Sequence, residues 1–292
     1  MKKRILISCI LAVAMTTTAQ QSPLLKKDGL YFGQKPPGKK AELFASKILT
    51  AEGHDSPIIS QDESWMLIGT MEHGAKFYKS TSSGLEPSVN PMNFIIPEEN
   101  NYNGLEISYS ENRVYFLVWK NNDENFYFIE KTKSGWTTPK PMSDEINSYR
   151  THWQFSLAKN ENFYFASEGT ILVAIFDGKT HLKPAPLKLE DNSILKGSTP
   201  FIDPDESYLI YSITSQETRK KSDLYISYKL QGDTWSMPVN LGYDINDENS
   251  LDLCPRISPN GKYLFFVSRR IGSYFKVFWA DAGFIEELIP KE

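Results

Sequence analysis

Eight polar, charged or aromatic residues of this chain could bind or transform a ligand if folding brought them together. They are His54, Asp55, Asn103, Glu106, His152, Trp153, Asp252 and Arg256. Imidazole and carboxylate groups are ordinary metal ligands, and two carboxyl groups about 5 to 9.5 Å apart can hydrolyse a glycosidic bond. Because these residues lie far apart in the sequence, only a fold that gathers distant segments can make them one site.

A metal site and an enzyme are both weaker interpretations than a binding surface. His54, His152 and Asp252 lack the tight ligand spacing of a typical metal site, and exposed loop residues around a polar funnel account for them better. We therefore expect no metal, no cofactor and no catalytic residue. A carbohydrate-active enzyme (glycoside hydrolase or lyase) that uses Asp55, Glu106 and Asp252 remains the alternative, although no Gly-x-Ser-x-Gly elbow or Ser-His-Asp arrangement is present.

The elements that carry these residues belong to a repeat. Its clearest copy covers residues 254–266, where a short strand meets Ser-Pro-Asn-Gly at 258–261 and an aromatic strand returns. Proline and Asn-Gly supply the fixed and positive φ angles of a tight reversal. Four weaker copies lie upstream, and the residues that we align with Ser258 are Ser60, Ser108, Leu157 and Asp203. The spacings are 48, 49, 46 and 55 residues.

Each copy continues into a third apolar strand, and two copies show a matching fourth element. That element reads Trp-x-x-Pro from Trp136 and Trp235, and each is followed by Ile-Asn, at 146–147 and at 245–246. Four short strands per repeat are typical of a propeller blade. We therefore predict an all-β β-propeller of four-stranded blades, with five blades visible. A sixth blade from the N-terminal segment, or a β-sandwich with accidental self-similarity, remains open.

Closure of the ring places the candidate residues around one channel. Residues 41–49 stand where a fourth strand would precede the first blade, and we expect them to pair with the last blade near residues 284–289, which removes an open sheet edge. The candidates then surround the channel mouth where the innermost strands begin. Two residues before each aligned position lie Ile58, Glu106, Phe155, Phe201 and Arg256. The two charged members of this set, Glu106 and Arg256, are expected to face the channel together.

The N-terminus has the pattern of a signal peptide. Lys2, Lys3 and Arg4 precede an apolar run over 5–15, and small residues follow it up to Ala19, near which we expect cleavage. A bilayer-spanning helix needs about 20 residues, so this run is too short and no transmembrane segment is predicted. We divide the chain into a signal peptide (1–19), an N-terminal extension (20–40) and one propeller domain (41–292).

The signal pattern predicts a periplasmic or secreted protein. A lipoprotein box ending at Cys9 is the less favoured alternative, because the apolar run continues past it. Removal of the signal peptide leaves Cys254 as a single cysteine, which excludes an intrachain disulfide. It also leaves 29 basic against 36 acidic residues, a net charge of about −7, which argues against a nucleic-acid partner. We expect a monomer.

Residues 258–266 resemble the WD-like repeat of TolB, whose pattern is roughly Ser-Pro-Asp-Gly-Lys followed by an aromatic strand. Residues 31–38 and 42–45 also resemble the opening of a group of exported propeller proteins. The resemblance implies a propeller in the periplasm or outside the cell. The role of TolB in envelope assembly is not transferred, because it depends on a further N-terminal domain that we do not see here. We predict a non-catalytic propeller that binds or scaffolds a protein or glycan partner in the cell envelope.

Overall fold

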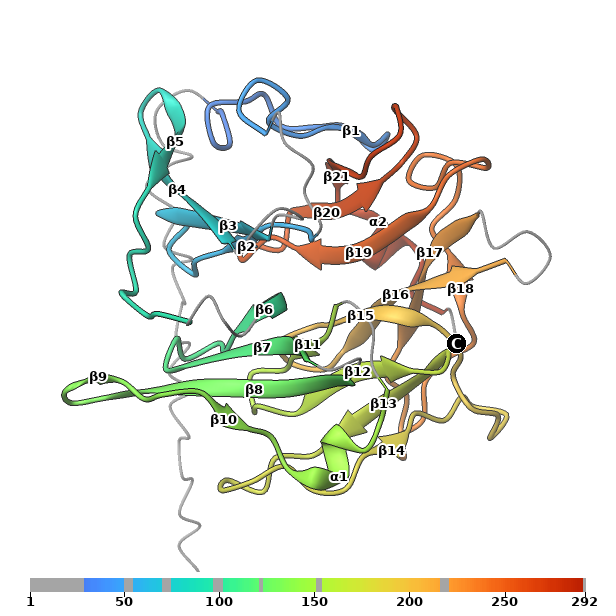
Figure 1. The fold of residues 1–292 in the computed structure, drawn as a ribbon. Coiled ribbons are helices and arrows are strands. Elements are labelled where there is room, and N and C mark those ends of the chain that lie inside the picture. The colour runs from blue at the N-terminus through green and yellow to red at the C-terminus, as the bar shows by residue number, and fades with distance from the viewer. Residues whose placement is uncertain are drawn as a thin grey trace, which may run out of the picture.

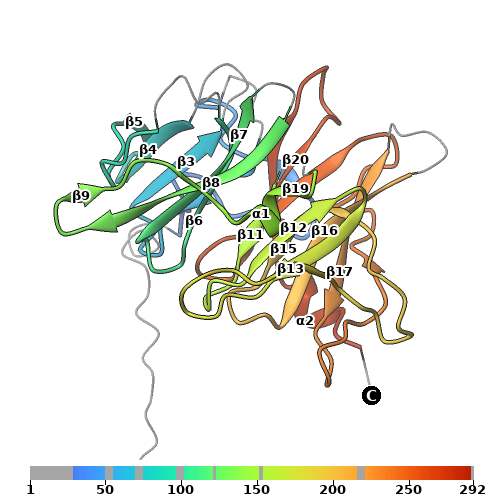
Figure 2. The same ribbon diagram turned by 60° about the horizontal axis from the view of Figure 1, so that its bottom comes forward.

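The computed structural model describes residues 29–49, 55–69, 75–96, 102–120, 123–150, 154–215 and 221–290. Their strands form five antiparallel sheets arranged as the blades of a propeller (Figures 1 and 2). The first strands of blades 2 to 5 contact one another in turn around the centre of the molecule, so they are the innermost strands. The predicted all-β propeller with five blades is confirmed.

The blades follow the order of the chain, except that the last blade takes its outermost strand from the N-terminal segment. Blade 1 contains β2 (Ile58–Ile59), β3 (Trp65–Gly69), β4 (Ala75–Thr81) and β5 (Gly84–Ser88). Blade 2 contains β6 (Tyr102–Ile107), β7 (Arg113–Lys120), β8 (Asp123–Thr132) and β10 (Lys140–Pro141), with β9 (Gly135–Trp136) paired to the end of β8. Blade 3 contains β11 (Ser156–Leu157), β12 (Phe163–Ser167), β13 (Thr170–Ala174) and β14 (Ala185–Pro186).

Blade 4 contains β15 (Ser198–Ile202), β16 (Tyr208–Thr214), β17 (Ser222–Tyr228) and β18 (Val239–Asn240). Blade 5 contains β19 (Asp252–Ile257), β20 (Tyr263–Ser268), β21 (Lys276–Asp281) and β1 (Glu42–Leu43). Two short helices, α1 (Asp144–Asn147) and α2 (Phe284–Glu287), follow blades 2 and 5. Neither helix, nor any other in the described ranges, has the length and hydropathy to span a bilayer.

The turns between the first and second strands share one backbone feature in all five blades. The backbone N–H that closes each turn belongs to Ser60, Ser108, Ala158, Asp203 and Ser258. The residue three positions later has a positive φ angle in every copy: Glu63 (56°), Glu111 (52°), Glu161 (69°), Glu206 (60°) and Gly261 (74°). Glycine meets this requirement without steric cost, whereas the four glutamates adopt a conformation that L-residues disfavour. The repeat is therefore a conserved turn shape rather than a conserved turn sequence.

In the third copy, the residue that corresponds to Ser258 is one position later in the chain than predicted. Its turn is one residue shorter, because Ala158 pairs with Asn162 where Ser258 pairs with Tyr263. The position predicted for Leu157 therefore belongs to Ala158. The residue of blade 3 that corresponds to Arg256 of blade 5 is therefore Ser156 and not Phe155. Ser156 lies opposite Tyr164 on the second strand of its blade, as Arg256 lies opposite Phe265.

The ring closes on the last blade, but at a different strand from the predicted one. Strand β1 pairs with β21, where Leu43 lies opposite Phe278, and the Phe44 N–H donates to the Val277 carbonyl at 2.9 Å (Figure 1). The predicted pairing near residues 284–289 is wrong, because residues 284–287 form helix α2. The described part of the N-terminal segment thus completes blade 5 and does not form a sixth blade.

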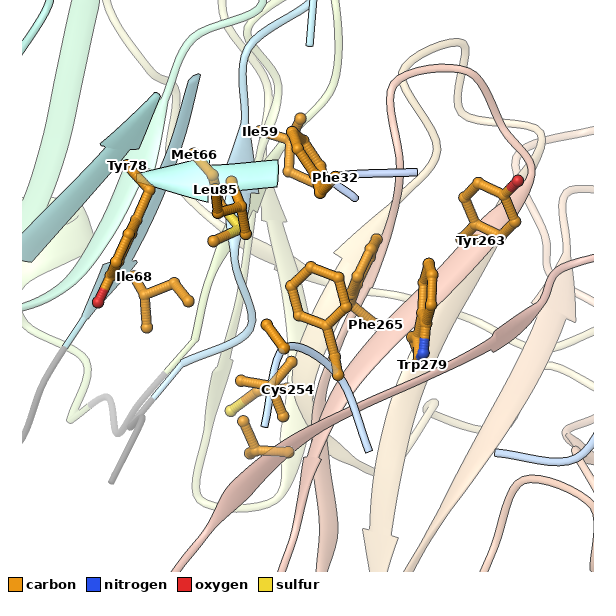
Figure 3. Close-up of a cluster of buried hydrophobic side chains, with 14 of the residues drawn as sticks. Phe32, Ile59, Met66, Ile68, Tyr78, Leu85, Cys254, Tyr263, Phe265 and Trp279 are labelled. Carbon is orange, nitrogen blue, oxygen red and sulfur yellow. The ribbon is translucent and has the colours of Figure 1, made fainter. Parts of the chain in front are cut away.

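Tyr31 and Phe32 fill the seam between blade 5 and blade 1. Both are buried in a cluster that joins side chains of the two blades (Figure 3). The Tyr31 ring lies 4.7 Å from that of Tyr263, and its hydroxyl donates to Glu63 Oε1 at 3.1 Å. The segment predicted as an N-terminal extension therefore contributes two residues to the core and links the last blade to the first.

The matching Ile-Asn pairs of blades 2 and 4 have the same structural role. Asn147 Oδ1 accepts from the Phe126 N–H at 2.7 Å, and Asn147 Nδ2 donates to the Phe126 carbonyl at 3.2 Å. Asn246 makes the same two bonds with Leu224, at 2.7 and 3.0 Å. Each asparagine fixes the chain that enters the next blade against the third strand of its own blade. The match predicted from sequence is confirmed.

Candidate functional site

An ion pair crosses the centre of the propeller. Arg256 on β19 places Nη2 2.6 Å from Glu106 Oε2 on β6, and the side chains are 8% and 10% exposed. The same Nη2 donates to the Leu105 carbonyl at 3.3 Å. Because β19 and β6 belong to blades 5 and 2, which are not neighbours in the ring, the pair spans the channel. Both residues therefore face the channel, and they meet across it.

The buried pair shifts the titration of both of its groups. Burial raises the pKa of Glu106, and the Arg256 guanidinium opposes that rise only in part. Burial also disfavours the charge on Arg256, but the Glu106 carboxylate outweighs it and raises the pKa of the guanidinium. Asp55 contributes in the same direction to both groups. The charge of Asp55 therefore acts on the Glu106–Arg256 pair, with a smaller effect than the two partners have on each other.

A second contact also crosses the channel. Gln154, which precedes β11 in blade 3, donates from Nε2 to the Pro255 carbonyl of blade 5 at 2.7 Å. Gln154 is buried, and its Oε1 has no hydrogen-bond partner among the described residues. Gln154 was not predicted from the sequence, because the turn of the third copy contains no proline or glycine to fix its register. Once Ala158 is matched with Ser258, Gln154 occupies the position of Cys254 in blade 5.

A cavity of about 290 Å³ lies on one side of this crossing, at the ends of the innermost strands. Glu106 and Arg256 line it and are buried, whereas Gln61, Tyr109 and Asp205 line it and are exposed. We call it the turn-side cavity, because the turns between first and second strands of blades 1, 2, 4 and 5 contribute to its wall, together with the strand ends next to them. The predicted mouth is the opposite one, where those strands begin.

The other predicted residues lie apart from the turn-side cavity. Asp252 is fully buried at the start of β19, where it pairs with Arg270 Nη2 at 2.8 Å and accepts from the Asp247 N–H at 2.7 Å. Burial raises the pKa of Asp252, and Arg270 limits the rise. Arg270 also donates to the Ile245 carbonyl at 2.6 Å, so this group holds the loop that precedes β19.

Four predicted residues cannot be placed by their side chains. His54, His152 and Trp153 lie outside the described residues. Asn103 lies in β6 opposite Leu117, and only its backbone is described. A ligand site at the mouth where the innermost strands begin therefore stays a prediction.

Carboxylates near the turns are held by tyrosine hydroxyls across blade boundaries. Tyr115 of blade 2 donates to Glu161 of blade 3 at 3.0 Å, and Tyr164 of blade 3 donates to Glu206 of blade 4 at 2.6 Å. Tyr31 provides the equivalent bond at the seam. These glutamates connect adjacent blades. Among the described residues, no group of three or more His, Cys, Asp or Glu side chains is arranged to hold a metal ion.

Comparisons with known proteins concern the fold. No protein-family model and no curated protein matches the sequence. Similar solved structures include TolB from Acinetobacter baumannii, with 12% identity and a TM-score of 0.48 over 78% of this chain and 56% of that one. The putative TolB from Agrobacterium tumefaciens has 15% identity and a TM-score of 0.46, over 79% of this chain and 77% of that one.

The β-propeller domain of Cps50 (Swd1) from Myceliophteria thermophila is also similar, with 8% identity and a TM-score of 0.45, over 83% of this chain and 86% of that one. This chain spans little more than half of the Acinetobacter TolB. The propeller fold expected from the repeat is confirmed by the strand order of the five blades.

Proposed function

We propose that this chain is an exported, monomeric and non-catalytic β-propeller that binds a protein or glycan partner of the cell envelope. The observation that carries the proposal is the turn-side cavity, which runs from exposed Tyr109 and Asp205 to the buried Glu106–Arg256 pair. A concave site with a few polar groups at its base and aromatic groups in its wall is the usual form of a ligand site. Its walls come from all five blades, so the folded ring positions them rigidly.

The state of the carboxylates supports binding over catalysis. A glycosidase needs one carboxyl group that donates a proton and a second that acts as base or nucleophile. Glu106 is held by Arg256, and Asp252 by Arg270, in buried ion pairs. These two carboxylates belong to separate ion pairs on different partners, so they do not form the converging pair of carboxyl groups that a glycosidase uses. The carbohydrate-active alternative is therefore the less favoured function.

Export is supported by the sequence of the N-terminus. Residues 1–28 lie outside the described part of the chain, and their basic start and apolar run are those of a signal peptide. Expression of the full chain with a C-terminal tag, followed by fractionation and N-terminal sequencing, tests it. We expect a mature product that begins near Gln20 in the periplasm or the medium. An uncleaved cytoplasmic product, or a lipidated product that begins at Cys9, contradicts the expectation.

Binding is tested with one set of variants in the turn-side cavity and a control variant outside it. Tyr109 is 40% exposed and lines the cavity, whereas Tyr243 is 83% exposed in the loop between β18 and β19 and is not part of the cavity lining. We expect the mature protein to retain a discrete partner from an envelope extract, and Tyr109→Ala with Asp205→Asn to reduce that retention while Tyr243→Ala leaves it unchanged. Equal retention by both variants overturns the assignment of the cavity. Turnover of a polysaccharide panel, abolished by Glu106→Gln, establishes the enzyme alternative.

A further inference from the structure

We propose that the turn-side cavity receives a lysine or arginine side chain of a protein partner. This inference rests on the proposed function and names the chemical group by which that partner is recognised. Three features of the described residues support it: a glutamate that lacks the partner its counterparts have, the charge of the cavity wall, and an ammonium group of the chain that already lies on an aromatic ring of the cavity.

Glu111 is the glutamate that lacks a partner. In the turn of blade 2 it corresponds to Glu63, Glu161 and Glu206, and like them it has a positive φ angle. Each of those three accepts a hydrogen bond from a tyrosine hydroxyl. The Glu111 carboxylate makes no hydrogen bond or ion pair with any described residue, and Glu111 lines the turn-side cavity whereas the other three glutamates do not.

The sequence of blade 1 explains the missing tyrosine. Tyr115 and Tyr164, which bind glutamates of the next blade, occupy the same position on the second strands of blades 2 and 3. The corresponding residue of blade 1 is Leu67. Leucine has no hydroxyl group to donate, so the Glu111 carboxylate is left without the bond that holds its counterparts at a blade boundary. Its charge is therefore available to a ligand in the cavity.

The wall of the cavity attracts cations. Apart from the Glu106–Arg256 pair, whose charges balance, the described residues of its lining include three carboxylates and no cation: Glu111, Asp203 and Asp205. Attraction between opposite charges is stronger in a partly desolvated cavity than in bulk water. The chain as a whole contains 36 acidic against 32 basic residues, which also favours approach of a basic partner. The wall therefore selects a positively charged group over a neutral or negative one.

The outer end of the cavity already lies next to an ammonium group of the chain itself. Lys159, from the turn of blade 3, places Nζ 5.3 Å from the centre of the Tyr109 ring and 3.9 Å from Asp205 Oδ1. The side chains of this ion pair are 56% and 79% exposed, so the pair contributes little and exchanges easily. A basic group of a partner can take the place of Lys159 and make the same cation–π contact with Tyr109.

The dimensions of the cavity suit one side chain. Its volume of about 290 Å³ is at the lower limit of small-molecule sites, which commonly hold about 300 to 1,000 Å³. Trp65 and Tyr208 line its wall. Lysine and arginine bury their apolar stems along such surfaces and keep their charged ends near polar groups. A single basic side chain that projects from a protein surface meets these requirements.

The test is a titration of the full mature chain with blocked pentapeptides, followed by ligand-detected NMR. The peptides have the form Gly-Gly-X-Gly-Gly, in which X is lysine, arginine, Nε-acetyl-lysine or glutamate. We expect the lysine or the arginine peptide to bind, with an affinity that falls as the salt concentration rises, because exposed charges are screened. Nε-acetyl-lysine keeps the stem and loses the charge, so its peptide should bind about fivefold more weakly than the lysine peptide.

Matched variants each remove one charge. Glu111→Gln should weaken binding of the basic peptide about threefold to fivefold. Glu248→Gln removes an exposed acid outside the cavity lining and should leave binding unchanged. Lys159→Gln should strengthen binding about twofold to fivefold, because it removes the competing ammonium group. Circular dichroism and the melting transition verify that each variant is folded.

Several results overturn the inference. They are preferential binding of the acetyl-lysine or glutamate peptide, equal weakening by Glu111→Gln and Glu248→Gln, and a Lys159→Gln variant that binds no more tightly than the unaltered chain. If Tyr109→Ala with Asp205→Asn loses an envelope partner but no basic peptide binds, the basic side chain is refuted and the proposed function stands. If neither partner nor peptide responds to the cavity variants, both are refuted.

Discussion

The hydrogen bond from Tyr31 to Glu63 is expected to be a major contributor to closure of the ring, and Tyr31→Phe tests it. The two residues are each 1% exposed, and the bond joins the N-terminal segment on blade 5 to the first turn of blade 1. Phenylalanine keeps the ring and its contacts with Tyr263 and Trp279, at 4.7 and 6.1 Å between ring centroids. The substitution therefore removes the hydroxyl and little else.

The expected loss of stability depends on the hydrogen bonds that the Glu63 carboxylate keeps after Tyr31→Phe. Among the described residues Tyr31 is the hydrogen-bond donor to the Glu63 carboxylate, and Glu63 Oε2 has no partner. A hydrogen bond to a charged group contributes about 1.5–3 kcal/mol, so Tyr31→Phe should lower the free energy of unfolding by that amount. For a chain of this size the corresponding fall in Tm is roughly 3–12 °C.

Tyr164→Phe is the matched comparison within the ring. Glu206 loses the Tyr164 hydroxyl but keeps Asn162 Nδ2 at 2.8 Å and Asn160 Nδ2 at 3.1 Å. Because the Glu206 carboxylate keeps two hydrogen-bond donors, we expect a smaller loss in the free energy of unfolding, about 0.5–1.5 kcal/mol. Urea denaturation followed by tryptophan fluorescence measures both variants, with an unchanged m-value as the sign that the same structure unfolds. A loss for Tyr31→Phe below that for Tyr164→Phe would refute the reasoning.

Three further predictions concern the channel, the boundary of blades 2 and 3, and the seam. Arg256→Met leaves the buried Glu106 carboxylate without its cation and should lower the free energy of unfolding by about 3–5 kcal/mol. Adding Glu106→Leu should restore most of this free energy, because no buried charge then remains. A double-mutant cycle measured by urea denaturation would contradict this if the two losses were additive. Burial lowers the pKa of His181, whose Nε2 lies 2.8 Å from the Glu161 carbonyl. As the pH falls below the ordinary value of 6.5, the unfolded imidazole takes up protons first, so stability declines there. His181→Phe should flatten this decline in thermal melts between about pH 7.5 and 5, and an equal slope counts against the assignment. Phe44 is 1% exposed, so Phe44→Ala leaves a cavity and should lower the free energy of unfolding by about 3–5 kcal/mol. Urea denaturation measures this loss, and a loss below about 1 kcal/mol would show that the seam does not depend on the Phe44 side chain.

Much of the fold could be predicted because the repeat is local. The reversal at 258–261 and its counterparts each lie within one short segment, so the pattern of residues was enough to find the first two strands of every blade. The asparagines of the two Ile-Asn pairs were found in the same way, since each bonds the third strand of its own blade. The one-residue error at Leu157 has a local cause as well. A turn that is one residue shorter leaves no mark in a sequence without proline or glycine.

The seam and the turn-side cavity were harder to predict. The sequence indicated that β1 is an outermost strand, but it did not identify β21 as the strand that β1 pairs with. The two strands lie more than two hundred residues apart in the chain, so no local pattern records their pairing. Tyr31 gave no signal of its place in the core, because Tyr263 and Glu63, its partners, come from opposite ends of the chain. The turn-side cavity could not be distinguished from the opposite mouth, because both are built from residues at the ends of the same strands.

The sequence by itself determined that this protein is a ring of five small sheets, because strand, turn and strand recur within windows in which neighbouring residues decide the backbone. It also singled out Glu106 and Arg256 as charges where other copies carry uncharged residues. Only the tertiary structure decided that these two charges meet across the channel, that Asp252 is bound to Arg270, and that the cavity lies beside the turns. Such contacts join blades that are distant in sequence, so they depend on how the closed ring packs rather than on any local pattern.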